Sequence, residues 1–303
     1  MQIFQEVARH LSYTRAAESL NLTQPAVFTQ VRQLEDQVGM ALIERLGRRL
    51  FLTEAGEVVL RSARDLLGEL EQMEMRLADL SGMARGRLRI GIVSTAKYDI
   101  PRRLGEFCRA HPGIDVSLTV GNREELLGRF AENEDDLYIL GTPPEGLDAE
   151  SHRFAENPLV MVAPPDHRLA GKPVQPTDLA TEAFVMREQG SGTRIAAERW
   201  FKQQGIEPLV RMELGANEAI KQAVMAGLGL SVLSRGSALL ELEQGYLTEL
   251  ALEDFPLLRH WHVAWPQGKR LSVGALAFLD ILFGKGCAPV PKALATGKAA
   301  STR

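Results

Sequence analysis

The start of the chain alternates apolar stripes of helical period with short polar turns. The stripes at Phe4, Val7 and Ala8 predict a helix over 3–10, and Ala16, Ala17 and Leu20 predict a second, short helix. Asn21-Leu22 breaks that pattern, after which the inward positions of a third helix are Val27, Val31, Leu34 and Val38. Thr23 can act as its N-cap, and Pro25 falls in the first turn, where its missing N–H costs nothing. Residues 12–37 therefore predict a helix-turn-helix.

The outward face of the third helix carries side chains suited to a major groove. Amide, hydroxyl and guanidinium groups can hydrogen-bond base edges or phosphates of double-stranded DNA. We expect DNA contacts from Thr23, Gln24, Pro25, Phe28, Thr29, Arg32 and Gln33. Phe28 has no hydrogen-bond donor, so it either contacts a thymine methyl or packs against the wing.

A hairpin and a long helix follow. Residues 41–52 predict a two-stranded wing turning at Gly47, with Arg48 and Arg49 near a phosphate backbone or minor groove. A solvated hairpin is the alternative. Thr53 then caps a helix to about Met83 whose apolar positions alternate in steps of four and three, which favours a dimerising coiled coil. Its seam is Val59, Ala63, Leu66, Leu70, Met73, Leu77 and Leu80.

The remainder predicts an α/β body. Strands over 88–93, 115–122 and 136–141 alternate with helices, and the alternation repeats over 157–234 with helices 193–204 and 217–226. A strand at 259–266 and a helix at 271–283 end it. We expect α plus α/β architecture with domains 1–57, 58–86 and 87–303. The last comprises lobe I (87–162 and 267–290), lobe II (163–266) and a disordered tail (291–303).

Polar residues follow the predicted strands, where open α/β sheets bind ligands. The convergence of Lys97, Arg123 and Arg194 predicts an anionic ligand such as a phosphate or carboxylate. The other candidates are Ser94, Thr95, Asn122, Ser191, Thr193, Asn217, Glu218 and, less favoured, Lys221. The hydroxyl residues can instead simply cap helices, and Gly190 and Gly192 can serve only a turn.

Composition narrows the classes of function. The net charge is −4, but residues 1–52 carry +1, so an almost neutral DNA-binding domain sits on an acidic body. No apolar run is long enough to cross a bilayer, and no secretory leader is evident, so we expect a cytoplasmic protein without membrane contact. Cys108 and Cys287 form no metal-binding pattern. Ser94 and Lys97 match S-x-x-K without its companion motifs, so we expect no enzyme.

Several of these segments resemble the LysR-type transcriptional regulators. The resemblance rests on STRAAESLNLTQPAV, QLEDQVGMALIERLGRR and LTEAGEVVL in the first part of the chain. In the body, VSTAKY, GNREELL, GTPPEGLD, NPLVMVAPPDHRLAG, REQGSGTR and ELGANEAIKQAVMAGLGLSVLSR resemble the branch that regulates Calvin-cycle (RuBisCO) operons.

The resemblance implies a periplasmic-binding-protein-like effector domain and a homotetramer built from homodimers. It also implies activation of carbon-fixation genes, with RNA polymerase as a possible partner. The effector would be a sugar phosphate, a nucleotide or NADPH rather than a cofactor, and Thr142 joins the expected contacts. Members usually begin several residues before Met1, so we expect the true start upstream. They commonly have serine where this chain has Phe28, which leaves the operator sequence open.

Two other functions compete with this one. A LysR-type regulator of a different operon would share everything except the effector. A two-lobed solute-binding protein would use the same lobes without DNA, but it would need a signal peptide and no helix-turn-helix. This sequence instead shows a helix-turn-helix and no evident signal peptide.

Overall fold

A computed structural model describes residues 1–47, 49–80 and 86–284. The chain divides into two compact units, Met1–Met83 and Ala84–Arg303. Arg48, Cys287 and the expected tail lie outside the described residues, as do the side chains of Leu77 and Leu80. No helix in the described part is both long and apolar enough to cross a membrane.

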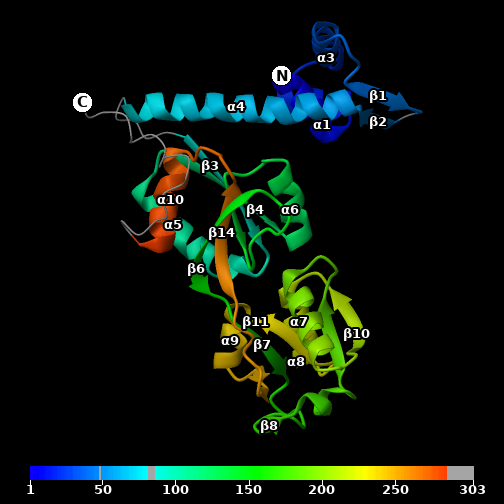
Figure 1. The fold of residues 1–303 in the computed structure, drawn as a ribbon, viewed down its shortest axis with the longest axis vertical. Coiled ribbons are helices and arrows are strands. Elements are labelled where there is room, and N and C mark those ends of the chain that lie inside the picture. Colours follow the sequence, from blue (N-terminus) through cyan, green and yellow to red (C-terminus); the bar gives the residue numbers. More distant parts are fainter. Residues whose placement is uncertain (48, 81–85, 285–303) are drawn as a thin grey trace. The chain divides into compact units, whose positions relative to one another are not determined.

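The first unit is a winged helix-turn-helix followed by a long helix (Figure 1), as predicted. Its elements are α1 (Gln2–His10), α2 (Tyr13–Leu20), α3 (Gln24–Val38), β1 (Ile43–Leu46), β2 (Arg49–Leu52) and α4 (Glu54–Leu80). Ser12 caps α2 by accepting from the Arg15 N–H, whereas Thr23 precedes α3 without a side-chain capping bond. The predicted inward position of Val38 is wrong: its side chain is 39 % exposed, because α3 has passed the end of the core.

A small core and one buried carboxylate hold this unit together. Phe4, Val7, Val27 and Val31 pack in one cluster, which burial of apolar surface stabilises. Glu35 is also buried, and its Oε1 accepts from the N–H groups of Leu42 (2.8 Å) and Ile43 (3.1 Å). The recognition helix α3 is thereby tied to the start of the wing.

Lobe I of the second unit is a five-stranded sheet in the order β4-β3-β5-β14-β6. In Figure 1, α5 and α10 lie on one side of this sheet and α6 on the other. Strands β3, β4 and β5 are parallel, and β14 runs antiparallel to β5 and β6. The elements are β3 (Gly86–Val93), a 3₁₀ turn (Ala96–Tyr98), α5 (Ile100–Ala110), β4 (Ile114–Gly121), α6 (Arg123–Ala131), β5 (Leu137–Leu140), β6 (Ala149–Glu156), β14 (His260–Pro266) and α10 (Val273–Phe283).

Lobe II buries both faces of its strands. Met161, Phe184 and Trp200 belong to one apolar cluster, and Val160 and Ile220 belong to another, because successive side chains of β7 point to opposite faces. The larger elements are β7 (Leu159–Ala163), β9 (Ala183–Arg187), α7 (Gly192–Gln203), β10 (Leu209–Leu214), α8 (Asn217–Met225), β11 (Ser231–Ser234) and α9 (Leu239–Glu243). The short ones are β8 (Pro173–Val174), β12 (Thr248–Glu249), β13 (Ala251–Leu252) and 3₁₀ turns at Pro176–Leu179 and Arg235–Ser237.

Strand pairing moves the expected boundaries between the lobes. β7 pairs with β11 and β12 of lobe II, although we expected it in lobe I, and β14 pairs with β5 and β6 of lobe I, although we expected it in lobe II. The chain therefore crosses near Asn157 and again near Arg259. These crossings lie side by side, because the Asn157 N–H donates to the Arg259 carbonyl at 2.7 Å. Strand β6 went unpredicted, since AESHRFAE lacks an apolar alternation.

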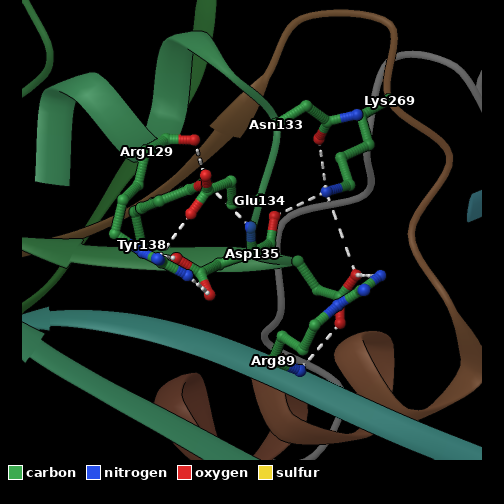
Figure 2. Close-up of polar contacts among 8 residues, drawn as sticks. Arg89, Arg129, Asn133, Glu134, Asp135, Tyr138 and Lys269 are labelled. Carbon is green, nitrogen blue, oxygen red and sulfur yellow. Dashed lines mark hydrogen bonds and ion pairs between the residues drawn. The ribbon is translucent and has the colours of Figure 1, made fainter. Parts of the chain in front are cut away.

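A polar network closes one end of lobe I (Figure 2). The buried carboxylate of Asp135 accepts two hydrogen bonds from Arg129, both 2.8 Å long, and Arg129 also pairs with Glu134 at 2.5 Å. The Tyr138 hydroxyl donates to the Arg129 carbonyl and accepts from the Asp135 N–H. Lys269 donates to Asn133 and to the Asp135 carbonyl. The network therefore joins the end of α6 to the loop before α10.

This network predicts unequal losses of stability at its two acids. Asp135→Asn should lower the free energy of unfolding by roughly 1.5–3 kcal/mol, because Arg129 loses its bidentate carboxylate partner while it keeps the ion pair with Glu134. Glu134→Gln, at a side chain that is 33 % exposed, should cost no more than about 1 kcal/mol. Urea denaturation measures both. Equal losses would show that the buried pair does not hold this end of the lobe.

Candidate ligand pocket and nucleic-acid interface

A pocket of about 360 Å³, part of it open to solvent, is lined by residues of both lobes. Six of the predicted ligand residues line it, namely Ser94, Thr95, Asn122, Arg123, Ser191 and Thr193. The other lining residues are Val93, Gly141, Asn157, Arg187, Gly192 and Arg259. The arrangement follows from the sheets: β3, β4 and β9 end at Val93, Gly121 and Arg187, so their carboxyl ends deliver these loops.

Two arginines bring positive charge into this pocket without a carboxylate partner among the described residues. Arg123 donates to the carbonyls of Thr142 (2.9 Å) and Pro143 (2.7 Å), and Arg259 donates to the carbonyl of Gly192 (2.9 Å). Burial, and then repulsion from Arg123, lowers the pKa of Arg259 to about 10. Burial also lowers the pKa of Arg123, against the opposing charge of Glu145. Because guanidinium groups stay protonated in proteins, these two arginines make their part of the pocket cationic.

The N-terminus of α7 adds neutral donors to the same wall. The first backbone N–H groups of a helix have no intrahelical acceptor and favour an anion. In α7 the first N–H group that donates to a helix carbonyl is that of Ile195, which donates to the Ser191 carbonyl. Gly192 and Thr193 precede it and line the pocket. By contrast, the Asn122 side chain forms a capping box with Glu125 at the start of α6.

Arg187 is a pocket residue that the sequence interpretation missed. Its guanidinium is almost fully buried, pairs with Glu188, and donates to Asn217 Oδ1 (2.7 Å) and to Ser94 Oγ (2.9 Å). The last bond joins lobe II to lobe I. The sequence feature that could have identified Arg187 is its place as a lone charged residue at the end of the apolar strand β9. Arg259 is similarly placed, directly before β14.

Arg194 does not play the part predicted for it. Its Nε donates to Glu198 (2.7 Å), and its Nη1 donates to the Arg187 carbonyl (2.8 Å) and contacts Glu213. Desolvation would lower the pKa of Arg194, but these two carboxylates outweigh it and raise that pKa. The residue is thus neutralised and does not line the pocket; it connects α7 to β10.

Two further predicted residues, Lys97 and Glu218, join with Tyr98 in a connection between the lobes, which we call the interlobe clamp. Lys97 Nζ lies 2.9 Å from Glu218 Oε2, and the Tyr98 hydroxyl donates to Glu218 Oε1 at 2.5 Å. Desolvation raises the pKa of Glu218, but the bonds from Tyr98 and Lys97 prevail and lower it to about 2. Because Lys97 pairs here and Ser94 accepts from Arg187, the two do not form a serine–lysine nucleophile pair.

The remaining candidates of the cleft have partners in the protein. Asn217 is buried against Arg187, and Thr142 uses its backbone carbonyl to accept from Arg123. Lys221 pairs with Glu241 at 2.7 Å, which agrees with a structural role for it. Among the residues that the structure describes, no cluster of three or more potential metal ligands is found.

On the first unit, the predicted DNA-contacting side chains share an exposed surface. Those exposed on or directly before α3 are Thr23, Gln24, Pro25, Phe28, Thr29, Arg32 and Gln33, and Arg49 is exposed on the wing. Thr29 donates its hydroxyl to the Pro25 carbonyl at 2.8 Å, which occupies that donor. Phe28 contacts Tyr13 of α2, and the two residues line a hollow together with Ile43 and Arg45 of the wing. The expectation for Arg48 lies outside the described residues.

Comparisons with known proteins agree with both parts. Residues 1–57 match the family model "Bacterial regulatory helix-turn-helix protein, lysR family", and residues 81–285 match "LysR substrate binding domain". The RuBisCO operon transcriptional regulator of Acidithiobacillus ferrooxidans is 48 % identical over 93 % of this chain and 92 % of its own.

Two solved structures are similar to this one. The Synechocystis CcmR regulatory domain in complex with 2-PG is 50 % identical, with a TM-score of 0.64, over 66 % of this chain and 96 % of that one. Full-length CbnR complexed with its target DNA is 21 % identical, with a TM-score of 0.64, over 93 % and 96 %, and supports the fold alone.

The interlobe clamp predicts a pH-dependent contribution to stability. Because the pKa of Glu218 is lowered from 4.5 to about 2 on folding, its contribution is present above pH 4.5 and is lost as the pH falls toward 2. The thermal midpoint of the wild type should exceed that of Glu218→Gln at pH 6, and the gap should narrow steadily as the pH falls from 4.5 toward 2. Since Glu218 is about half exposed, the gap should be small. Glu207→Gln controls for the loss of one negative charge, and a gap independent of pH would contradict the clamp.

Proposed function

The chain belongs to the LysR family of transcriptional regulators, and we propose that it regulates carbon-fixation genes, the RuBisCO operon among them, in response to a small anionic metabolite. The target genes are inferred from relatives that share most of the chain's length. Besides the Acidithiobacillus protein, the RuBisCO operon transcriptional regulator of Allochromatium vinosum is 48 % identical over 94 % of this chain.

The observation that carries the effector proposal is the pair of partly buried guanidinium groups, Arg123 and Arg259, which have no carboxylate within ion-pair distance in the described part of the chain. Buried charges are costly unless they are paired, so such a site favours a ligand that brings negative charge. A phosphate or carboxylate fits, because it accepts from guanidinium groups and from the N-terminus of α7 together. The regulatory domain solved with 2-PG, 50 % identical, supports a phosphorylated effector.

The proposed switch uses the two crossings between the lobes. An anion held by Arg123 of lobe I, by Arg259 at a crossing and by α7 of lobe II contacts all three parts at once. It would favour the lobe arrangement in which these groups meet, as differential affinity requires. We propose that this change activates transcription from the operator, with RNA polymerase as a partner, and that the protein acts in the cytoplasm, where the DNA is.

We also propose that α4 dimerises and that two dimers assemble into a tetramer. Of the expected seam, Val59 packs against the core of the first unit and Ala63 is buried. Leu66, Leu70 and Met73 are 61, 47 and 50 % exposed. Exposed apolar residues at heptad spacing favour a coiled-coil partner. Leu66→Glu with Leu70→Glu should shift sedimentation from dimer or tetramer toward monomer. Arg61→Glu, on the opposite side of the repeat, should not.

The effector site is tested by ligand binding to matched arginine variants. Arg259→Gln should raise the Kd for the probe 2-phosphoglycolate roughly 10- to 100-fold, since one charge-assisted contact is lost. Arg102→Gln removes the same charge from an exposed position of α5 and should bind as the wild type does. Isothermal titration gives the constants, and a panel of Calvin-cycle intermediates, nucleotides and NADPH ranks the effectors. Unchanged binding by Arg259→Gln would contradict the assignment.

A further inference from the structure

An aromatic ring stands on the surface of the helix that faces DNA. Phe28 lies one turn after the first residues of α3, and its side chain is 42 % exposed. The N-terminal part of a recognition helix is the part that reaches base edges. On α3 itself the exposed neighbours Gln24, Thr29 and Arg32 are polar, so the ring interrupts a helix face otherwise suited to hydrogen bonds.

The ring is held in a defined position rather than left free. The Tyr13 ring meets it edge to face, with centroids 5.3 Å apart and planes at 70°. The Arg32 guanidinium lies 5.8 Å from the centroid of Phe28 and is 3.7 Å from Glu35. Glu35 is itself fixed by the first two N–H groups of the wing. A chain of contacts from the wing to α2 therefore orients the ring, and the exposed part of it faces solvent in the isolated unit.

Such a ring can read only an apolar feature of DNA. It has no donor or acceptor for a base edge or a phosphate, and the nearby Thr29 hydroxyl is already occupied by Pro25. In the major groove the one apolar mark that distinguishes a base is the C5-methyl group of thymine. Arg32, stacked over the same ring, remains able to reach a guanine or a phosphate beside it.

We propose that Phe28 is a specificity-determining residue, whose ring contacts the methyl group of a thymine in each half-site of the operator. The proposal rests on the proposed function, in that α3 must enter the major groove. It adds a base preference: a thymine at the position facing Phe28, which a serine at that position would not select.

Replacing thymine by deoxyuridine tests the contact, because it removes the methyl group and leaves the hydrogen-bonding edge unchanged. The full-length protein first selects duplexes from a random pool, and each thymine of an enriched duplex is then replaced in turn. At the thymine facing Phe28, the wild-type Kd should rise about three- to tenfold in fluorescence anisotropy, as expected for one buried methyl group. Phe28→Ser should bind the two duplexes equally.

Two variants keep this test decisive. Phe28→Leu retains an apolar side chain and should keep part of the preference for thymine, which a merely destabilised fold would not do. Val38→Ser removes an exposed apolar group from the far end of α3 and should keep the full preference. If no duplex is enriched, DNA binding itself is wrong. If duplexes are enriched but deoxyuridine has no effect at any position, or Phe28→Ser keeps the effect, only the role of Phe28 is overturned.

Discussion

The pocket of the second unit contains two partly buried positive charges that form no ion pair with a carboxylate in the described part of the chain. Arg123 and Arg259 repel each other, and carbonyl oxygens rather than carboxylates hold them in place. Elsewhere in the same cleft the chain does the opposite: Arg187 pairs with Glu188, and Arg194 contacts Glu198 and Glu213. Carboxylates pair with the structural arginines, whereas in the described part of the chain none lies within ion-pair distance of Arg123 or Arg259, which favours the proposed ligand site there.

Arg259 is placed where a bound anion can influence the arrangement of the two lobes. It lies at a crossing between the lobes, where its carbonyl accepts from Asn157 of the other crossing, while its guanidinium reaches the start of α7 in lobe II. Other bonds also span the lobes, from Arg187 to Ser94 and through the interlobe clamp. An anion bound at Arg259 would act on the segments that any movement of the lobes must bend, and small preferences between two arrangements are enough to shift their populations.

Periodicity and strand ends allowed much of this to be predicted. The helix-turn-helix, the wing and the strands up to β5 came from apolar spacing, and six pocket residues came from the rule that ligands bind beyond parallel strands. Arg187 and Arg259 were missed because each adjoins an apolar strand and no motif marks it. Arg194 was misassigned because its carboxylate partner Glu213 comes from β10, a pairing in space that spacing along the chain cannot reveal. The lobe boundaries failed likewise, since only strand pairing decides which sheet β14 joins.

The claim that Arg123 and Arg259 bind an anionic effector is tested most directly by a crystal structure of this protein grown with 2-phosphoglycolate. We expect the phosphate or carboxylate of the ligand within hydrogen-bonding distance of the Arg259 guanidinium and of the first N–H groups of α7, with Arg123 on the other side. A ligand bound elsewhere, or one that leaves Arg123 and Arg259 without an anion, would contradict the proposed effector site.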